Sequence, residues 1–246
     1  MSIVRARPRS MPGVVTTYCA GCGHGIVHRI LGECVDELDL AGKLVGVAPV
    51  GCAVNMYDFF DLDYVEVAHG RAPAVATGLK KALPDHFILV YQGDGDLASI
   101  GMAEIVHAVN RGLPLTFVFV NNATYGMTGG QMAPTTLVGQ KTATSPRGRD
   151  VRTDGYPIRM CELLATLDGA VYLERTKVNT PADVNRTKKA IRKAFEVQLA
   201  GRGAALVEVL AMCPTNWHMD PVAALDFVET MAATFPVGVI KDTTGK

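Results

Sequence analysis

Two short apolar runs lie close together in the first half of the chain. The first spans residues 87–91 and the second spans residues 115–120, and each has the length of a buried strand. Between them, apolar residues recur at near-helical spacing, at Ile100, Ile105, Val106 and Val109. This pattern predicts a β-α-β unit with parallel strands, in which both strands end at the same edge of a sheet.

The rest of the chain continues the alternation of strands and helices. Further strands are expected at 44–47, 170–174 and 205–210. Further helices are expected at 25–38, 75–83, 160–167, 181–200 and 221–235. This order predicts one α/β domain over residues 1–246, with a mostly parallel sheet and helices on both faces. The domain is expected to include an N-terminal arm (1–18) and a C-terminal cysteine loop and helix (211–246) that ends in a polar tail.

Polar residues follow the two central strands where each is expected to end. The first strand runs into Gly93-Asp94-Gly95-Asp96 and the second into Asn121-Asn122. Asp94 and Asn122 are 122 − 94 = 28 positions apart, the length of one helix and one strand. Their oxygens suit Mg²⁺ that also keeps phosphate and water ligands. The Gly95 and Asp96 N–H groups open the helix, as at an anion site, although a glycine-rich strand-to-helix turn is the simpler interpretation.

Six cysteines are present, and four of them are expected in loops. Cys34 and Cys161 fall in helical segments and are interpreted as small buried hydrophobic residues. The other four precede a helix or follow a strand: Cys19, Cys22, Cys52 and Cys213. A structural zinc, a redox-active pair and an iron–sulfur cluster are all compatible with this set.

Composition narrows the function classes. The chain carries 24 basic and 24 acidic residues, so no net field favours nucleic acid or a membrane surface. The apolar runs are too short for a membrane span, and the N-terminus lacks the apolar core of a signal peptide. A cytoplasmic location is therefore expected, and there cysteines favour metal or redox chemistry over disulfides.

The strand-end motifs resemble those of a known enzyme family. Gly93-Asp94-Gly95 followed by Asn121-Asn122 resembles the metal and diphosphate motif of thiamine diphosphate enzymes. The segment Tyr125–Gln131 (YGMTGGQ) narrows the resemblance to the β subunit of 2-oxoacid:ferredoxin oxidoreductases, and it covers nearly the whole chain. It implies that Asp94, Asn122 and the Thr124 carbonyl hold Mg²⁺.

The resemblance also implies further ligands. The family binds one [4Fe–4S] cluster through a CxGCGH turn, a GC after the next strand and a late CPT loop. In this chain the matching cysteines are Cys19, Cys22, Cys52 and Cys213. Ala20 replaces the proline that is commoner in the first turn. The implied contacts of thiamine diphosphate are Gly51, Cys52, His69, Gly95, Asp96, Gly126 and Met127. For His69, a role in satisfying its own turn is an equally good interpretation.

The activity implied is oxidative decarboxylation of a 2-oxoacid, with coenzyme A as acyl acceptor and ferredoxin as electron acceptor. An α subunit, and γ or δ subunits in some members, would complete the enzyme. The YGMTGGQ and CPTNW segments most resemble members that use 2-oxoglutarate, with branched-chain 2-oxoacids or pyruvate as alternatives. A non-redox thiamine enzyme with a structural zinc and a regulatory protein with a Cys₄ metal site are the competing hypotheses.

Two basic groups are candidates for docking an acidic ferredoxin. One is the arm, with Arg5, Arg7 and Arg9, and the other is the helix at 181–200, with Lys188, Lys189, Arg192 and Lys193. The arm directly precedes Cys19 and is the favoured candidate. The arm is otherwise expected to be a loose terminus that packs on a partner chain. The long segment 132–155 lacks periodicity and is expected to be functional or interfacial.

Overall fold

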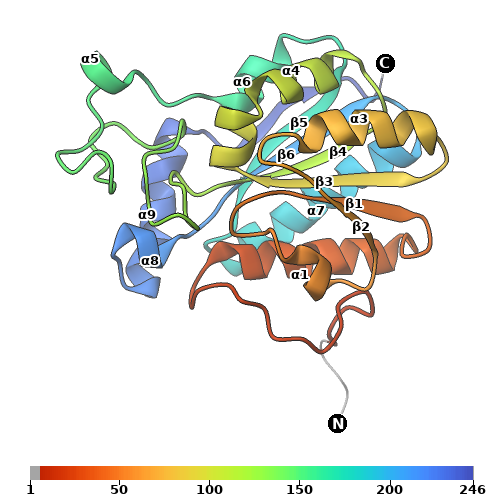
Figure 1. Ribbon diagram of the computed structural model, residues 1–246, viewed down its shortest axis with the longest axis horizontal. Helices are drawn as coiled ribbons and strands as arrows, with labels where there is room; N and C mark the ends of the chain where they lie inside the picture. The colour runs from red at the N-terminus through yellow and green to blue at the C-terminus, as the bar shows by residue number, and fades with distance from the viewer. Residues whose placement is uncertain (1–5, 246) are drawn as a thin grey trace.

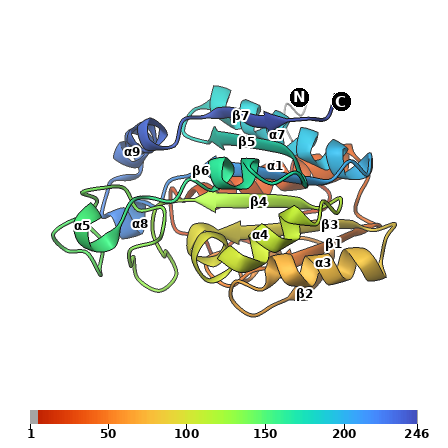
Figure 2. The ribbon, with the colours of Figure 1, turned by 90° about the horizontal axis from the view of Figure 1, so that it is seen from above.

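The computed structural model describes residues 6–245, and its centre is a twisted sheet (Figure 1). The strands found in this part of the chain are β1 (Leu44–Ala48), β2 (Asp63–Glu66), β3 (Phe87–Gly93), β4 (Thr116–Asn121), β5 (Ala170–Lys177), β6 (Ala204–Leu210) and β7 (Gly238–Asp242). Their order across the sheet is β2-β1-β3-β4-β6-β5-β7 (Figure 2). Only β7 pairs antiparallel among the described strands, and this confirms the expected mostly parallel α/β domain.

Helices cover both faces of the sheet. The longer helices are α1 (Gly23–Glu37), α3 (Ala72–Ala82), α4 (Met102–Asn110), α6 (Met160–Ala165), α7 (Pro181–Leu199) and α9 (Pro221–Thr234). The shorter ones are α2 (Met56–Phe59), the π-helix η1 (Asp96–Ile100), α5 (Val151–Asp154) and α8 (Pro214–Trp217). In Figure 1, α1 and α7 lie on one face of the sheet, and α3 and α4 lie on the other.

Alternation along each strand divides the core into two layers. In β3, Leu89 and Tyr91 pack with α1 and α7, whereas Ile88 and Val90 pack with α3 and α4. Both faces of a central parallel strand are therefore buried, which explains why β3 is continuously apolar in sequence.

Two edge strands were not expected from the sequence. At one edge, the Tyr64 ring of β2 lies over Gly46 of β1, where a Cβ would stand 2.0 Å from the ring. At the other edge, residues 238–242 form β7, so the expectation of a polar tail is wrong. Ile240 of β7 packs against the core layer of α3, α4 and α6, while Val239 stays exposed. An edge strand that is buried on one side has few apolar residues in sequence, and for this reason β2 and β7 were not predicted.

The N-terminal arm packs on its own chain. Asp36, near the end of α1, accepts hydrogen bonds from the backbone N–H groups of Arg9 and Ser10. The Ser10 hydroxyl is buried and donates to the Gly32 carbonyl, 3.2 Å away. The expectation of a loose terminus is therefore wrong for residues 8–11, whereas Arg5 lies outside the described residues. No helix within residues 6–245 is long and apolar enough to cross a membrane.

The strand order brings the predicted functional loops together. β1, β3, β4 and β6 are consecutive neighbours in the sheet, and their carboxyl ends meet at one edge. Cys52, Asp94, Asn122 and Cys213 follow these strands in turn. The start of α1 joins the same edge, because the Gly23 N–H donates to the Met212 carbonyl over 3.0 Å.

Candidate functional site

Asp94 lies at the end of β3, with 2% of its surface exposed. Its carboxylate accepts hydrogen bonds from the Gly95 N–H (2.8 Å), the Thr124 N–H (3.2 Å) and the Thr135 hydroxyl (2.6 Å). Burial raises the pKa of Asp94 to about 7, although these hydrogen bonds act in the opposite direction. The side chain is therefore held in one orientation by groups from three separate segments.

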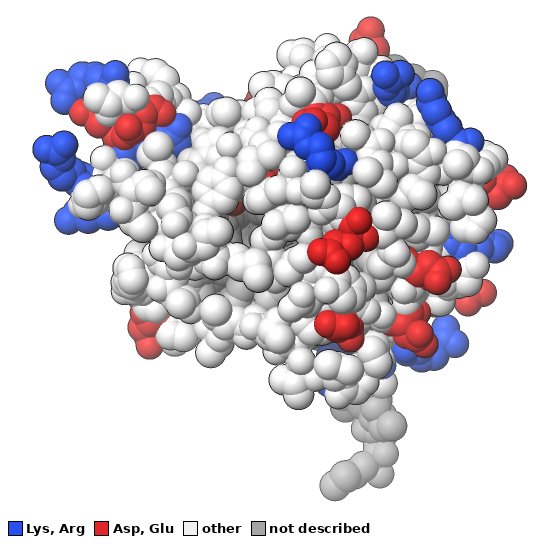
Figure 3. Space-filling model, in the orientation of Figure 1, with Lys and Arg blue, Asp and Glu red and all other residues white. Residues whose placement is uncertain are grey.

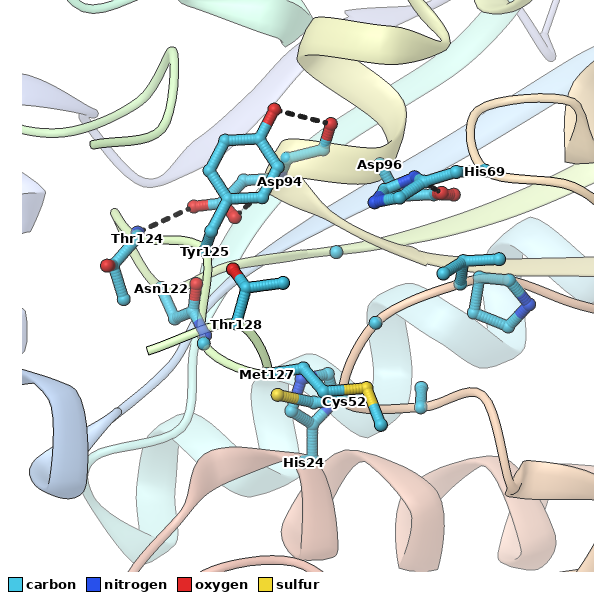
Figure 4. Close-up of a pocket in the computed structure, with 17 residues that line it drawn as sticks. His24, Cys52, His69, Asp94, Asp96, Asn122, Thr124, Tyr125, Met127 and Thr128 are labelled. Atoms are coloured by element: carbon cyan, nitrogen blue, oxygen red, sulfur yellow. Dashed lines mark hydrogen bonds and ion pairs between the residues drawn. The ribbon is translucent and has the colours of Figure 1, made fainter. Parts of the chain in front are cut away.

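The groups expected to bind Mg²⁺ meet beside this carboxylate. The side-chain amide of Asn122, which follows β4, faces Asp94 (Figure 4). The amide atom nearest to Asp94 lies 3.3 Å from both carboxylate oxygens and 2.8 Å from the Thr124 carbonyl oxygen. With its nitrogen in this place the amide donates hydrogen bonds to these oxygens, and a turn of 180° would present its oxygen to a cation instead. The donor set fits Mg²⁺, and it brings together the three residues expected from the sequence.

The turn after β3 is shaped by close packing. The Tyr125 ring lies over Gly95, where a Cβ would stand 2.1 Å from it, and the Tyr125 hydroxyl donates to the Gly95 carbonyl at 3.2 Å. The helix that follows begins as η1, a π-helix, and becomes regular only in α4. Such irregular turns are frequent at functional sites.

Asp96 and His69 form a second part of the site. The Asp96 carboxylate is buried, accepts the Gly70 N–H at 2.9 Å and lies in contact with His69 Nδ1. Gln92 donates to the other carboxylate oxygen. The Asp96 side chain thus fixes the turn that carries His69, while a role for its N–H in binding phosphate stays a prediction.

These residues line one pocket together with others that sequence reasoning missed. All of the expected cofactor contacts are present: Gly51, Cys52, His69, Gly95, Asp96, Gly126 and Met127. The additional lining residues are His24, Pro49, Val50, Ala53, Gly93, Tyr125 and Thr128. His24 reaches this pocket from the first turn of α1.

The four loop cysteines line an adjacent pocket, with Tyr18 and Asn216. Cys52 lines both pockets and therefore lies between them. Burial raises the pKa of Cys22 and of Cys52 to about 12, and the neighbouring cysteines add to both shifts. Asn216 donates a hydrogen bond to Cys213 Sγ over 3.4 Å.

The two remaining cysteines lie elsewhere. Cys34 and Cys161 are fully buried in the core layers, as expected, and line neither pocket. Within residues 6–245, no three His, Cys, Asp or Glu side chains converge on a point where a single metal ion could be held. The four loop cysteines share one pocket.

The two basic groups proposed for ferredoxin docking are not where the sequence suggested. The backbone of Arg9 binds Asp36, which lies near the end of α1. Asp36 follows Cys22 by 36 − 22 = 14 positions, so the rise of the helix separates the two by about 21 Å. On α7, Lys188 pairs with Glu33 and Glu37, at 2.8 and 2.6 Å, and Arg192 also pairs with Glu37. The part of the arm that carries Arg9 therefore lies at the far end of α1 from Cys22, and the arm reaches the cysteine pocket only at Thr17 and Tyr18.

Comparisons with known proteins agree with this geometry. Residues 49–209 match the family model described as thiamine pyrophosphate enzyme, C-terminal TPP binding domain. The chain is 53% identical over 232 residues to the ketoisovalerate oxidoreductase subunit VorA of Methanothermobacter thermautotrophicus, covering 94% of this chain and 49% of that protein. It thus spans about half the length of this relative.

Two further relatives match over more of their own length. The 2-oxoglutarate synthase subunit KorB of Methanocaldococcus jannaschii is 37% identical, over 81% of this chain and 70% of that protein. A solved structure, 2-oxoglutarate:ferredoxin oxidoreductase from Magnetococcus marinus with 2-oxoglutarate, coenzyme A and succinyl-CoA bound, matches with a TM-score of 0.77 and 27% identity, over 98% of this chain and 86% of that one. Through these matches and its pocket, the chain belongs to the thiamine pyrophosphate-binding subunits of the 2-oxoacid:ferredoxin oxidoreductase family.

Proposed function

We propose that this chain binds thiamine diphosphate, Mg²⁺ and a [4Fe–4S] cluster within an enzyme that oxidatively decarboxylates a branched-chain 2-oxoacid. Coenzyme A would accept the acyl group and ferredoxin the electrons. The observation that carries the proposal is the convergence of Asp94, Asn122 and the Thr124 carbonyl at a pocket that shares Cys52 with the cysteine pocket.

The arrangement of the cysteines supports a cluster over zinc. A [4Fe–4S] cluster places one cysteine on each of four irons, so it needs four cysteines around one pocket. The four loop cysteines line one pocket, and Cys52 also lines the pocket proposed for thiamine diphosphate. A redox group in this place could accept electrons from the cofactor, whereas zinc could not.

The residues of this chain would hold and orient the cofactor. Thiamine diphosphate, when bound, supplies an electron sink for the pair released as CO₂ leaves. Asp94, Asn122 and Thr124 would hold the metal that neutralises its diphosphate. Gly126 lets the backbone pass close to Cys52, since a Cβ there would stand 2.9 Å from Cys52 Sγ. The chain can therefore place the cofactor and the cluster on opposite sides of Cys52.

Partner subunits are part of the proposal. Relatives named as oxidoreductase subunits support a multi-subunit enzyme, with an α subunit and further γ or δ subunits as candidates. The M. thermautotrophicus relative is about twice the length of the matched region, which suits a second functional unit working beside this one.

The substrate proposal departs from the 2-oxoglutarate expected from the sequence, which the comparisons leave unconfirmed. Identity is 53% to a ketoisovalerate oxidoreductase subunit and 37% to a 2-oxoglutarate synthase subunit. No Lys or Arg lines either pocket within the described residues, so a second substrate carboxylate would find no cation on this part of the chain. Figure 3 agrees, because the hollowed centre of this face carries little charge and the charged side chains gather around it. An apolar branched side chain suits these surroundings better.

Anaerobic purification of the assembled enzyme tests the cofactors. We expect thiamine diphosphate, Mg²⁺, and iron and acid-labile sulfide in equal amounts. The variant Cys213→Ser should lose or weaken the visible iron–sulfur band, and Cys34→Ser serves as the matched control that keeps it. Zinc without sulfide, or an unchanged spectrum in Cys213→Ser, would refute the cluster assignment.

Steady-state rates test the substrate. The assembled enzyme should have a higher kcat/KM for 2-oxoisovalerate than for 2-oxoglutarate or pyruvate, at saturating coenzyme A and ferredoxin. A preference for 2-oxoglutarate would restore the sequence-based expectation and would require a cation from a partner subunit.

A further inference from the structure

A buried chain of charged and polar side chains runs from the surface to the metal-binding loop. Arg175 of β5 is 1% exposed, and its guanidinium forms ion pairs with Glu162 of α6 and Glu208 of β6. The Glu208 carboxylate has no exposed surface; it accepts from Arg175 Nε at 2.9 Å and from Asn121 Nδ2 at 2.8 Å. Asn121 directly precedes Asn122, so the chain of contacts reaches the proposed Mg²⁺ site.

The last link enters the loop itself. The Asn121 side-chain oxygen accepts the Ala123 N–H at 3.1 Å. Ala123 has a φ of 54°, a left-handed conformation that is unusual for a residue with a Cβ. This residue lies between Asn122 and Thr124, and the Asn122 amide lies beside both Asp94 and the Thr124 carbonyl oxygen. The Asn121 amide therefore holds the turn that brings Asn122 and Thr124 to one place.

The polarity of the chain depends on a carboxylate at position 208. Arg175 and the Asn121 amide nitrogen are both donors, so the group between them must accept on both sides. A glutamine can accept on one side only, and its NH₂ group would face a donor on the other. If the Asn121 amide turned over to accept from that NH₂ group, it would lose the Ala123 N–H. The Glu208 carboxylate thus fixes which way the Asn121 amide points.

We propose that Glu208 is a positioning residue for the metal-binding loop, acting through Asn121 on the oxygens of Asn122 and Thr124. The inference rests on the proposed function, because it concerns the affinity of the proposed Mg²⁺ site. Glu208 touches neither metal nor cofactor in this role. Its effect is to keep the loop in its metal-binding shape before the ion arrives.

Binding of thiamine diphosphate as a function of Mg²⁺ concentration tests this role. The assembled enzyme is stripped of both ligands, and binding is followed by calorimetry while Mg²⁺ is varied. For Glu208→Gln we expect the half-saturating Mg²⁺ concentration to rise by about tenfold, with full binding restored at high Mg²⁺. The matched control is Glu162→Gln, which removes an equal charge from the same arginine at the exposed end of the network. That control should stay within about twofold of the wild type.

The outcomes separate this inference from the proposed function. If Glu208→Gln is folded and its Mg²⁺ dependence equals that of the wild type, the positioning role is refuted and the metal site stands. A wild-type enzyme whose thiamine diphosphate binding ignores Mg²⁺ would overturn both. If Glu208→Gln does not fold, Asn121→Ala tests the same link while keeping the ion pair between Arg175 and Glu208. An unchanged Mg²⁺ dependence in Asn121→Ala would again refute the role.

Discussion

At the scale of single residues, the site depends on a few side chains held by many partners. Asp94 receives hydrogen bonds from its own turn, from the loop after β4 and from Thr135. A carboxylate held in this way is preorganised, so little ordering remains when a cation binds. Its loss should therefore affect binding more than folding.

The variant Asp94→Ala should lose thiamine diphosphate, because Mg²⁺ without its carboxylate ligand cannot bridge to the diphosphate. Thiamine content after purification is the measurement, with Asp85→Ala, an exposed acidic residue at a distant turn, as the control. Full retention of the cofactor in Asp94→Ala would exclude the metal assignment.

A buried histidine gives the protein a sensitivity to acid. His28 is fully buried among Tyr18, Phe59, Phe60 and Tyr91, and burial lowers its pKa well below the usual value. It is neutral in the folded chain but gains a proton in the unfolded chain below a pH of about 6.5. The unfolded state then binds more protons, so stability falls as the pH decreases.

We expect His28→Phe to reduce this acid dependence by up to about 1.4 kcal/mol per pH unit below a pH of about 6. The melting temperature between pH 5 and 8 measures the effect, and His107→Gln, at an exposed histidine, is the control. Parallel pH profiles for wild type and His28→Phe would contradict this account.

Residue chemistry also explains which parts of the site were predictable. Asp94 and Asn122 carry their signal in sequence, since each directly follows an apolar strand. Thr135 carries no such signal, because it reaches Asp94 from a loop without periodicity, 41 positions away. The contacts of Glu208 with Arg175 and Asn121 were also not predictable, because the sequence does not show which residues pair with a glutamate inside an apolar strand.

At the scale of elements, the long loop after the site is ordered by one arginine. Arg149 is buried, and its guanidinium donates hydrogen bonds to backbone carbonyls on both sides of the loop; the acceptors are Ala133, Pro134, Thr136, Asp154, Gly155 and Tyr156. The loop projects from the body of the molecule with α5 at its tip (Figures 1 and 2). Arg149 therefore replaces the hydrophobic core that this segment lacks, and it fixes the backbone around Thr135.

The variant Arg149→Ala should lower the free energy of unfolding by about 2–4 kcal/mol, because several buried carbonyls lose their donor. It should also speed proteolytic cleavage within residues 137–158. The exposed Arg147 provides the matched control, since Arg147→Ala removes the same side chain two positions away. Equal cleavage rates in the two variants would show that the loop is ordered by other contacts.

Elements with buried faces were predictable and those without were not. The central strands and the longer helices were found within a few residues of their observed bounds because their apolar spacing is strong. The short helices α2, α5 and α8 have four residues each, too few to develop a period. The strand β7 has one covered face and exposes Val239 on the other, which removed its signal.

At the scale of the whole molecule, basic side chains pair with acidic side chains of the same chain. The cations of α7 face acidic groups of α1 and β7, as the pairs of Lys188 with Glu37 and of Lys193 with Asp242 illustrate. Arg9 and Ser10 of the arm bind Asp36 near the end of α1 that is remote from the cysteines. The sequence shows which residues are charged but not which residues they pair with. The two docking surfaces predicted from it are therefore not supported by the structure.

Charge reversal at Arg7 and Arg9 should therefore leave ferredoxin reduction unchanged at physiological salt, contrary to the expectation from the sequence. The separation of about 21 Å exceeds two Debye lengths of about 8 Å each at physiological salt. The packing of the arm should survive, since Asp36 binds backbone N–H groups of the arm. Rates of ferredoxin reduction at several salt concentrations check this, and a selective slowing would return the docking site to the arm.

The cysteine pocket joins the two ends of the chain, and this has a consequence for the order of folding. Cys19 and Cys213 are 213 − 19 = 194 positions apart, so the pocket exists only after β6 has paired with β4. A prosthetic group bound there would close a loop of most of the polypeptide, and the entropy of the unfolded chain would fall accordingly. Capture of the group would then mark the completion of the sheet, and a nascent chain released before β6 would have no place to receive it.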